Sequence, residues 1–273
     1  MIKQLLIRSP YLRFKSQLIR KAIDTLLYRM LGHDKRIASF KDQCKGKPLL
    51  VIGNGPSLNN TPLDKFIGVN SIGMNKIDLI FSKVRWRPTF IICVNGIVME
   101  QNKEYFQKTD IPVLLDYKAF YLRIKGNAIN YFRTTLGWDF SKDFSEKVGN
   151  GPTVTYHALQ FAYYLGANPV IIFGVDHSFK FEGKKMEYVK SEGADVNHFD
   201  PNYFANGSLW GLPDLEGSEV VYQKVKNAFE ADGRKVFDAT IGGKLQIFEK
   251  ISLAEALSIC DTSINKEELT TIN

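Results

Sequence analysis

Two short turns in this sequence combine glycine, asparagine and proline with a hydroxyl residue. The first, Gly53-Asn54-Gly55-Pro56-Ser57, follows an apolar run, and the second, Gly149-Asn150-Gly151-Pro152-Thr153, opens a segment with helical spacing. Glycine lets a backbone turn sharply and approach a ligand, and free N–H groups at a helix start attract anions. Neither turn matches a P-loop or the G-x-G-x-x-G pattern. We expect the turns to clamp a nucleotide phosphate; the simpler interpretation is two similar helix starts.

Histidines are scarce, and two of them occupy positions that favour chemistry. His177 follows Asp176 at the end of a predicted strand, and His198 lies in the polar segment 180–215. A neutral imidazole near pH 7 can accept a proton from an attacking hydroxyl. We expect His198 to be either such a base or an exposed loop residue, and His177 either to bind a ribose hydroxyl or to cap a turn. His157, inside a helical pattern, is expected to be structural.

The residues that would hold a metal ion are not arranged for it. No two aspartates are separated by a single residue, so the D-x-D metal site of common sugar-nucleotide transferases is missing. The cysteines Cys44, Cys93 and Cys260 lie far apart, which predicts neither a zinc site nor a disulfide framework. A sugar activated with CMP leaves a monophosphate and needs a metal less than a diphosphate does. The sequence therefore predicts no metal site and no bound cofactor.

Strands that alternate with helices must position these residues. Apolar runs predict strands at 48–52, 69–75, 88–94, 111–115, 168–175 and 235–238, and helical spacing predicts helices at 97–107, 153–165, 217–232 and 252–259. This alternation predicts an α/β fold with a doubly wound, mainly parallel sheet. Ligands of such sheets bind beyond the carboxyl ends of the strands, where Gly53–Ser57, Asn95 and Asp176–His177 fall. Residues 117–150 are interpreted as a lid-like insertion, and residues 180–215 as a long loop.

The positive charge of the chain is concentrated at its start. The net charge is +7, but residues 1–48 hold 12 Lys and Arg against three Asp, which leaves −2 for the remainder. This distribution argues against a nucleic-acid groove across the fold. We divide the chain into a basic amphipathic helical arm at 1–46, a catalytic domain at 47–260 and a tail at 261–273.

Apolar residues recur at helical spacing through residues 1–32, with Lys and Arg between them. Such a helix could bind an anionic membrane surface, pack on the domain with its basic face in water, or form a homo-oligomer contact. The longest apolar runs are about eight residues, short of the roughly 20 that span a bilayer, and no signal-peptide pattern is present. We expect a cytoplasmic protein, peripheral to the inner face of the cell membrane if the arm binds lipid.

The ordered set of motifs resembles two related families. Residues 51–58, Val-Ile-Gly-Asn-Gly-Pro-Ser-Leu, resemble the opening of the bacterial lipooligosaccharide sialyltransferases and of the MptE-like (6-hydroxymethylpterin diphosphokinase-like) family. Further motifs look like the MptE-like family: Trp86–Phe90 with Asn95, Gly174–Asp176, His198–Phe199 before Tyr203, and Phe237–Leu245 with Phe248. The resemblance covers roughly residues 47–250 and does not explain the arm.

The resemblance implies a Rossmann-like fold, a CMP donor and an inverting transfer. Carried over residue by residue, the donor site would use Gly53, Asn54, Gly55, Pro56, Ser57, Asn95, Gly151, Thr153, Asp176 and His177. His198 would be the base, and Tyr188 and Tyr203 are candidates for the tyrosines that such enzymes place near the donor phosphate.

The leading hypothesis is transfer of an acidic, nonulosonic-type sugar from a CMP donor to a cell-surface glycan. A basic arm suits an enzyme whose acceptor is a lipid-linked glycan at the inner membrane. An alternative is a pterin pyrophosphokinase that uses ATP and Mg²⁺, with Asp176, Asp195 and Asp200 as candidate ligands. A third hypothesis is a non-catalytic, membrane-associated nucleotide-binding protein.

Overall fold

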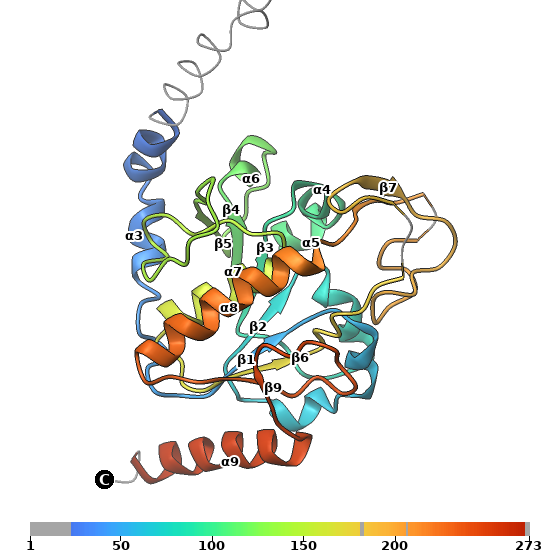
Figure 1. Ribbon diagram of the computed structural model, residues 1–273. Coiled ribbons are helices and arrows are strands. Elements are labelled where there is room, and N and C mark those ends of the chain that lie inside the picture. The colour runs from blue at the N-terminus through green and yellow to red at the C-terminus, as the bar shows by residue number, and fades with distance from the viewer. Residues whose placement is uncertain (1–22, 181–182, 206, 271–273) are drawn as a thin grey trace, which may run out of the picture.

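The computed structural model describes residues 23–180, 183–205 and 207–270, and for 262–270 the backbone alone. Within them, eight strands form one parallel sheet in the order β10-β9-β6-β1-β2-β3-β4-β5 (Figure 1). The strands are β1 Leu49–Ile52, β2 Ser71–Met74, β3 Phe90–Cys93, β4 Val113–Asp116, β5 Ile129–Phe132, β6 Val170–Phe173, β9 Val236–Asp238 and β10 Glu249–Lys250. The predicted α/β fold with a doubly wound, mainly parallel sheet is confirmed.

The central strands are buried on both faces, as their continuous apolar runs require. Every residue of β1 is buried, with Leu50 and Ile52 on one face and Leu49 and Val51 on the other. Burial of this apolar surface is the main stabilising term, at roughly 25 cal/mol per Å².

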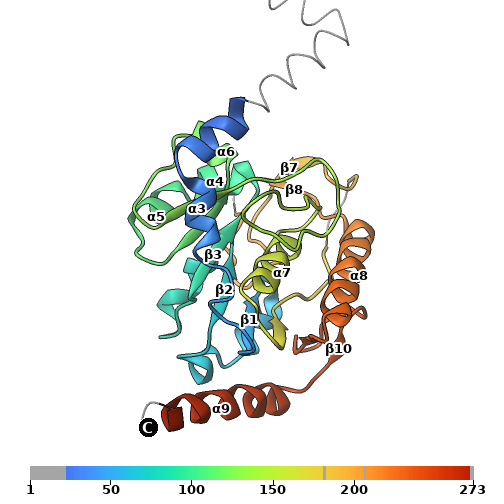
Figure 2. The ribbon, with the colours of Figure 1, turned by 90° about the vertical axis from the view of Figure 1, so that its left-hand side faces the viewer.

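Helices cover the two faces of the sheet (Figures 1 and 2). The face that includes Leu49 and Val51 packs against helices α3 His33–Ala38, α7 Val154–Tyr164 and α8 Leu215–Ala231. The other face packs against α4 Gly96–Gln101, α5 Lys103–Lys108, α9 Leu253–Thr270 and the 3-10 turns η1 Pro56–Asn60, η2 Leu63–Phe66 and η3 Ile77–Ser82. Helices α7 and α8 each start at a capping side chain: Thr153 accepts from the N–H of Thr155, and Asp214 accepts from the N–H of Gly217.

Two segments differ from the sequence-based interpretation. Residues 117–150, interpreted as a lid-like insertion, contain helix α6 Lys118–Tyr121 and strand β5 at the edge of the main sheet. Residues 180–215, interpreted as a long loop, contain an antiparallel hairpin of β7 Tyr188–Lys190 and β8 Leu209–Gly211. The edge strand is short and carries Asn130, and both hairpin strands are only three residues long, so neither has a clear apolar alternation.

The two ends of the chain extend the predicted elements. Residues 23–30 are helical, Ile37 and Cys44 belong to the core, and the N–H of Cys44 donates to the carbonyl of Leu165. This part of the predicted arm therefore packs on the domain, while residues 1–22 lie outside the described residues. At the other end, helix α9 continues through Thr270 into the predicted tail. In the described part of the chain, no helix has both the length and the apolarity to cross a membrane.

The order of the strands defines where a ligand would bind. Strands β2 to β5 lie on one side of β1, and β6, β9 and β10 lie on the other. After β5 the chain returns to place β6 on the other side of β1, so the boundary between the neighbouring strands β1 and β6 is a topological switch point. The crevice at the carboxyl ends of the strands beside such a switch point is the usual ligand site of open α/β sheets.

Candidate functional site

A cavity of about 460 Å³ opens at this switch point. It falls in the size range of small-molecule sites. The predicted residues among those that line it are Gly53, Asn54, Gly55, Asn95, Gly151, Thr153, Asp176, His177 and His198. Pro56 and Ser57 do not line it. The fold thus brings most of the predicted residues together, and their roles in donor binding remain predictions.

The first glycine turn is bonded to the end of β6 rather than open to an anion. The N–H of Gly53 donates to the carbonyl of Phe173 at 2.7 Å, and that of Gly55 to the carbonyl of Gly174 at 2.8 Å. A Cβ atom on Gly55 would lie 1.9 Å from a carboxylate oxygen of Asp176. The close approach of these two chain segments therefore explains the glycines without a ligand.

Asp176 holds this turn in place. Its carboxylate accepts from the N–H of Ser57 at 3.1 Å and from the Ser57 hydroxyl at 2.6 Å. Asn54 is placed differently, because its Nδ2 donates to the carbonyl of Met74 while its buried Oδ1 has no hydrogen-bond partner within the described residues. A buried acceptor is normally satisfied, so Asn54 is suited to accept from a hydroxyl or amino group of a bound ligand.

The second turn offers the better site for an anion. Thr153, Val154 and Thr155 line the cavity at the N-terminus of the 11-residue helix α7. The N–H groups and the macrodipole at such an end favour negative charge. Two further side chains line the cavity there: Lys118, whose Nζ lies 3.8 Å from Asp116, and Tyr222, whose hydroxyl lies 3.5 Å from Thr153 Oγ1.

The loop before this turn is held by Gln160, a fully buried residue of α7. Its Oε1 accepts from the N–H of Gly149 and from that of Ser141, both at 3.0 Å. Its Nε2 donates to the carbonyl of Gly149 at 2.9 Å. One side chain thereby fixes the approach to the α7 N-terminus.

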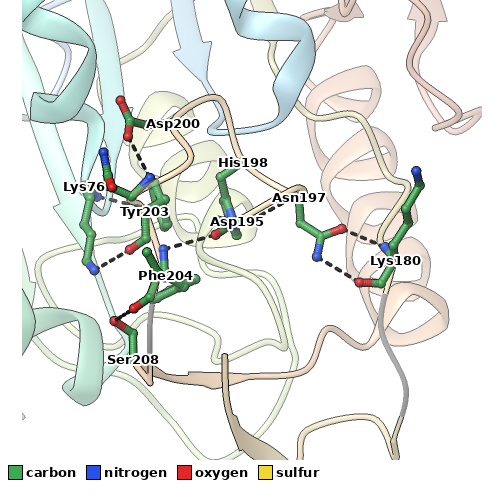
Figure 3. Close-up of polar contacts among 11 residues, drawn as sticks. Lys76, Lys180, Asp195, Asn197, His198, Asp200, Tyr203, Phe204 and Ser208 are labelled. Carbon is green, nitrogen blue, oxygen red and sulfur yellow. Dashed lines mark hydrogen bonds and ion pairs between the residues drawn. The ribbon is translucent and has the colours of Figure 1, made fainter. Parts of the chain in front are cut away.

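His198 lies at the cavity with one ring nitrogen already bonded (Figure 3). Its Nδ1 is 2.7 Å from Oδ2 of Asp195, and its ring stacks on Tyr203 with centroids 4.0 Å apart. A carboxylate on Nδ1 fixes the tautomer and leaves Nε2 to accept a proton, as in the histidine of a catalytic triad. Sequence reasoning selected His198 but treated Asp195 only as a candidate metal ligand.

Asp195 is itself well held. Its carboxylate also accepts from the N–H of Asn197 at 2.7 Å and from that of Phe204 at 3.1 Å. Burial alone would raise the pKa of Asp195, but the hydrogen bond and charge of His198 and the two N–H groups lower it below its usual value. Asp195 therefore stays ionised near neutral pH and can keep Nδ1 of His198 protonated.

Comparison with known proteins identifies the family. Residues 26–182 match the family model described as 6-hydroxymethylpterin diphosphokinase MptE-like, which is more than half of the chain. The chain belongs to this MptE-like family. The predicted resemblance is thus confirmed, whereas no curated protein matches the chain.

Among solved structures, this MptE-like protein is similar to the MAf glycosyltransferase from Magnetospirillum magneticum AMB-1. The TM-score is 0.51 at 15% sequence identity. The match covers 85% of this chain and 41% of that one, so the chain spans less than half of its length. At this identity the likeness concerns the fold, and it agrees with the Rossmann-like architecture.

Two further histidines of this MptE-like protein have structural contacts. His177 has a left-handed backbone, with φ 52°, and its Nε2 lies 2.9 Å from Glu219 of α8. His157 is fully buried with Nδ1 3.1 Å from the carbonyl of Thr153, and burial lowers its pKa to about 4. Asn95, expected at the donor, caps α4 by accepting from the N–H of Ile97.

The three carboxylates of the pyrophosphokinase alternative contact different partners. Asp176 binds Ser57, Asp195 binds His198, and Asp200 lies 3.5 Å from Lys83 Nζ. Within the described part of the chain, no group of three or more His, Cys, Asp or Glu could hold a metal ion.

Sequence reasoning missed several residues of the cavity wall. Of the two candidate tyrosines, Tyr188 lines the cavity, whereas Tyr203 stacks on His198 and does not line it; Tyr222 was not selected. Trp210 of the hairpin also lines the cavity, and Gln101 of α4 donates to the carbonyl of Leu209 beside it. Asp195 and His198 are only three positions apart in the sequence, and this short separation is the one local feature that could have indicated their pairing.

Proposed function

We propose that this protein is a glycosyltransferase that moves an acidic, nonulosonic-type sugar from a CMP donor to a hydroxyl of a cell-surface glycan, with His198 as general base. The observation that carries the proposal is the Asp195–His198 pair at the cavity that also contains the α7 N-terminus. The pair supplies a base and the helix end an anion site, which are the two functions that such a transfer needs. The sialyltransferase-like fold implied by the family resemblance supports the same chemistry.

The reaction would proceed in one displacement. The acceptor oxygen attacks the anomeric carbon of the sugar, the bond from that carbon to the phosphate oxygen breaks, and CMP leaves with the electron pair. The hydroxyl proton passes to Nε2 of His198, and the carboxylate of Asp195 stabilises the resulting imidazolium. Inversion at the anomeric carbon follows from this direct attack.

The charges around the α7 N-terminus suit the leaving group. The phosphate of CMP would lie near the N–H groups of Thr153 and Val154, with Lys118 and Tyr222 beside it. Preorganised donors at the position where negative charge develops are a large term in such catalysis. Asn54 Oδ1 would accept from a hydroxyl or amino group of the donor.

A nucleotide panel tests the proposal. The melting temperature is measured with CMP, CDP, UDP, ATP and NAD, each with and without Mg²⁺, for the wild type and for Lys118→Ala. We expect CMP to stabilise the wild type without metal and to stabilise Lys118→Ala less, because a ligand that binds only the native state raises its stability. A failure of every nucleotide to stabilise the protein would favour a non-catalytic binding protein instead.

The second candidate is the reaction after which the family is named, diphosphate transfer to a pterin alcohol. It would use ATP and Mg²⁺, and would have to recruit Asp176, Asp195 or Asp200 from their present contacts. Stabilisation by ATP only when Mg²⁺ is present would favour this candidate over the first.

A further inference from the structure

The helical residues 23–30 and the turn after them carry a continuous apolar stripe on the outside of the molecule. Its members are 36% to 72% exposed: Ile23, Leu26, Leu27, Met30 and Leu31. Their spacing, at i, i+3, i+4, i+7 and i+8, places them on one face of a helix. A surface helix normally turns such a face toward the core, so this stripe is the reverse of ordinary packing.

The opposite side of the same segment is fixed to the domain. Tyr28 is buried, donates its hydroxyl to the carbonyl of Tyr131 at 3.0 Å and packs edge-on against Tyr117. Arg29 forms an ion pair with Glu146 at 2.8 Å. These contacts hold the segment with its apolar stripe outward, so the exposure is built into the fold.

The charge of the arm indicates what covers the stripe. Residues 1–23 contain six Lys and Arg and no Asp or Glu, and Lys35 and Arg36 beyond the stripe are exposed. A second copy would bring two such cationic segments together, which is unfavourable. An anionic lipid surface attracts these cations and buries apolar side chains at the headgroup boundary.

The stripe and the cavity lie toward the same end of the molecule. The hydroxyl of Tyr121 in α6 donates to Asp24 beside the stripe, and Lys118 at the start of α6 lines the cavity. In Figures 1 and 2 residues 23–30 lie at the end that also carries α6, α4 and the β7 hairpin strand. A membrane bound to the stripe would therefore lie near the entrance of the site.

We propose that Ile23, Leu26, Leu27, Met30 and Leu31 dock this protein on an anionic lipid membrane. The docking is independent of the reaction in the cavity. Its consequence, that the cavity meets an acceptor held at the lipid surface, rests on the proposed glycosyl transfer.

Vesicle flotation of the full chain tests the docking, without any nucleotide. Wild-type protein is mixed at low salt with vesicles of phosphatidylcholine alone or with added phosphatidylglycerol. We expect it to float with the anionic vesicles only, and Leu26→Glu/Met30→Glu to bind them at least tenfold more weakly. Val220→Glu is the matched control, because Val220 is an exposed apolar residue on helix α8. It should float like the wild type.

Two results would overturn the docking: a wild type that does not float, or a double variant that floats equally well. Sedimentation at several protein concentrations, without vesicles, tests whether a second copy of the chain covers the stripe instead. A wild-type dimer that the double variant loses, with no flotation, would assign the stripe to a second copy. Transfer to a water-soluble acceptor should be unchanged in the double variant. A failure of the proposed function would therefore appear in this transfer assay and not in the flotation assay.

Discussion

At the residue scale, Asp195 has two functions at once. It orders its own loop by accepting from the N–H groups of Asn197 and Phe204, and it orients His198 through Nδ1. The family resemblance predicted His198, but its partner depends on how residues 195–204 fold back on themselves. Asp176 lines the cavity and its carboxylate binds Ser57, so its role as a donor ligand stays a prediction.

The role of Asp195 can be tested by Asp195→Asn. The amide removes the negative charge that stabilises the imidazolium, so we expect kcat to fall about 100- to 10,000-fold with a smaller change in KM. His198→Ala should lose a similar factor, and the double variant should be no worse than His198→Ala, because residues that act as a unit are not additive. Steady-state kinetics measure this. Asp200→Asn is the control, since Asp200 lies on the same loop and contacts Lys83. If the loss of kcat in the double variant equalled the product of the losses in the two single variants, the pairing of Asp195 with His198 would be contradicted.

The glycine of the first turn leads to a stability prediction. Gly55→Ala would place a methyl group 1.9 Å from the Asp176 carboxylate, so either this carboxylate must give up its Ser57 hydrogen bonds or the backbone of the turn must move. We expect a loss of about 1–3 kcal/mol in the free energy of unfolding, measured with urea. Gly137→Ala is the control, because the nearest atom to its new methyl group is 3.9 Å away. Equal stability of the two variants would mean that the turn is looser than described.

At the element scale, the strength of the apolar pattern separates what the sequence predicts from what it does not. Helix α8 buries residues at helical spacing, and α7 is buried along nearly its whole length. Both are apolar enough and begin at capping side chains, so both were predictable. Strands β7 and β8 are short and partly exposed, and they pair with each other beside the cavity, which Tyr188 and Trp210 line. Contacts distant in sequence, rather than local preference, decide such elements.

Helix α7 should lose stability in acid because of His157. Burial lowers the folded pKa of His157 to about 4 from 6.5, so its contribution is fully present above pH 6.5 and is lost as the pH falls toward 4. At 1.36 kcal/mol per pH unit the loss is roughly 3 kcal/mol. We expect the wild type to lose more unfolding free energy than His157→Gln between pH 7 and about pH 4.5, as measured by urea titration. Parallel losses in the two proteins would argue against a buried neutral histidine.

At the scale of the whole molecule, the winding of the sheet determines where the site lies. Gly53 and Asp176 were predictable as neighbours because they follow strands of one parallel sheet. Lys118, Tyr222 and Trp210 were not, since each reaches the cavity from an element whose position depends on packing. The sequence therefore predicted where the site lies better than it predicted which residues line it.

The cavity is lined by residues of several elements, including the first glycine turn, the N-terminus of α7 and helix α8, so a ligand there would link these elements. CMP at about 100 times its dissociation constant should add about 2.7 kcal/mol to stability. For a chain of this size that corresponds to a rise in melting temperature of roughly 5–10 °C. Calorimetry should show one transition that moves as a whole. If the scan showed two transitions and CMP raised the melting temperature of only one, the cavity would not couple the elements that surround it.

Gln160 has a consequence for the thermodynamics of binding. Because it bonds both the N–H and the carbonyl of Gly149, the backbone leading to the α7 N-terminus is ordered before any ligand arrives. A preordered site loses little conformational entropy on association. Its heat-capacity change should then reflect only the apolar surface that the ligand covers, not the larger value of a segment that folds on binding. A ligand would therefore bind to a site that is already ordered, and no segment of the protein would have to fold around it.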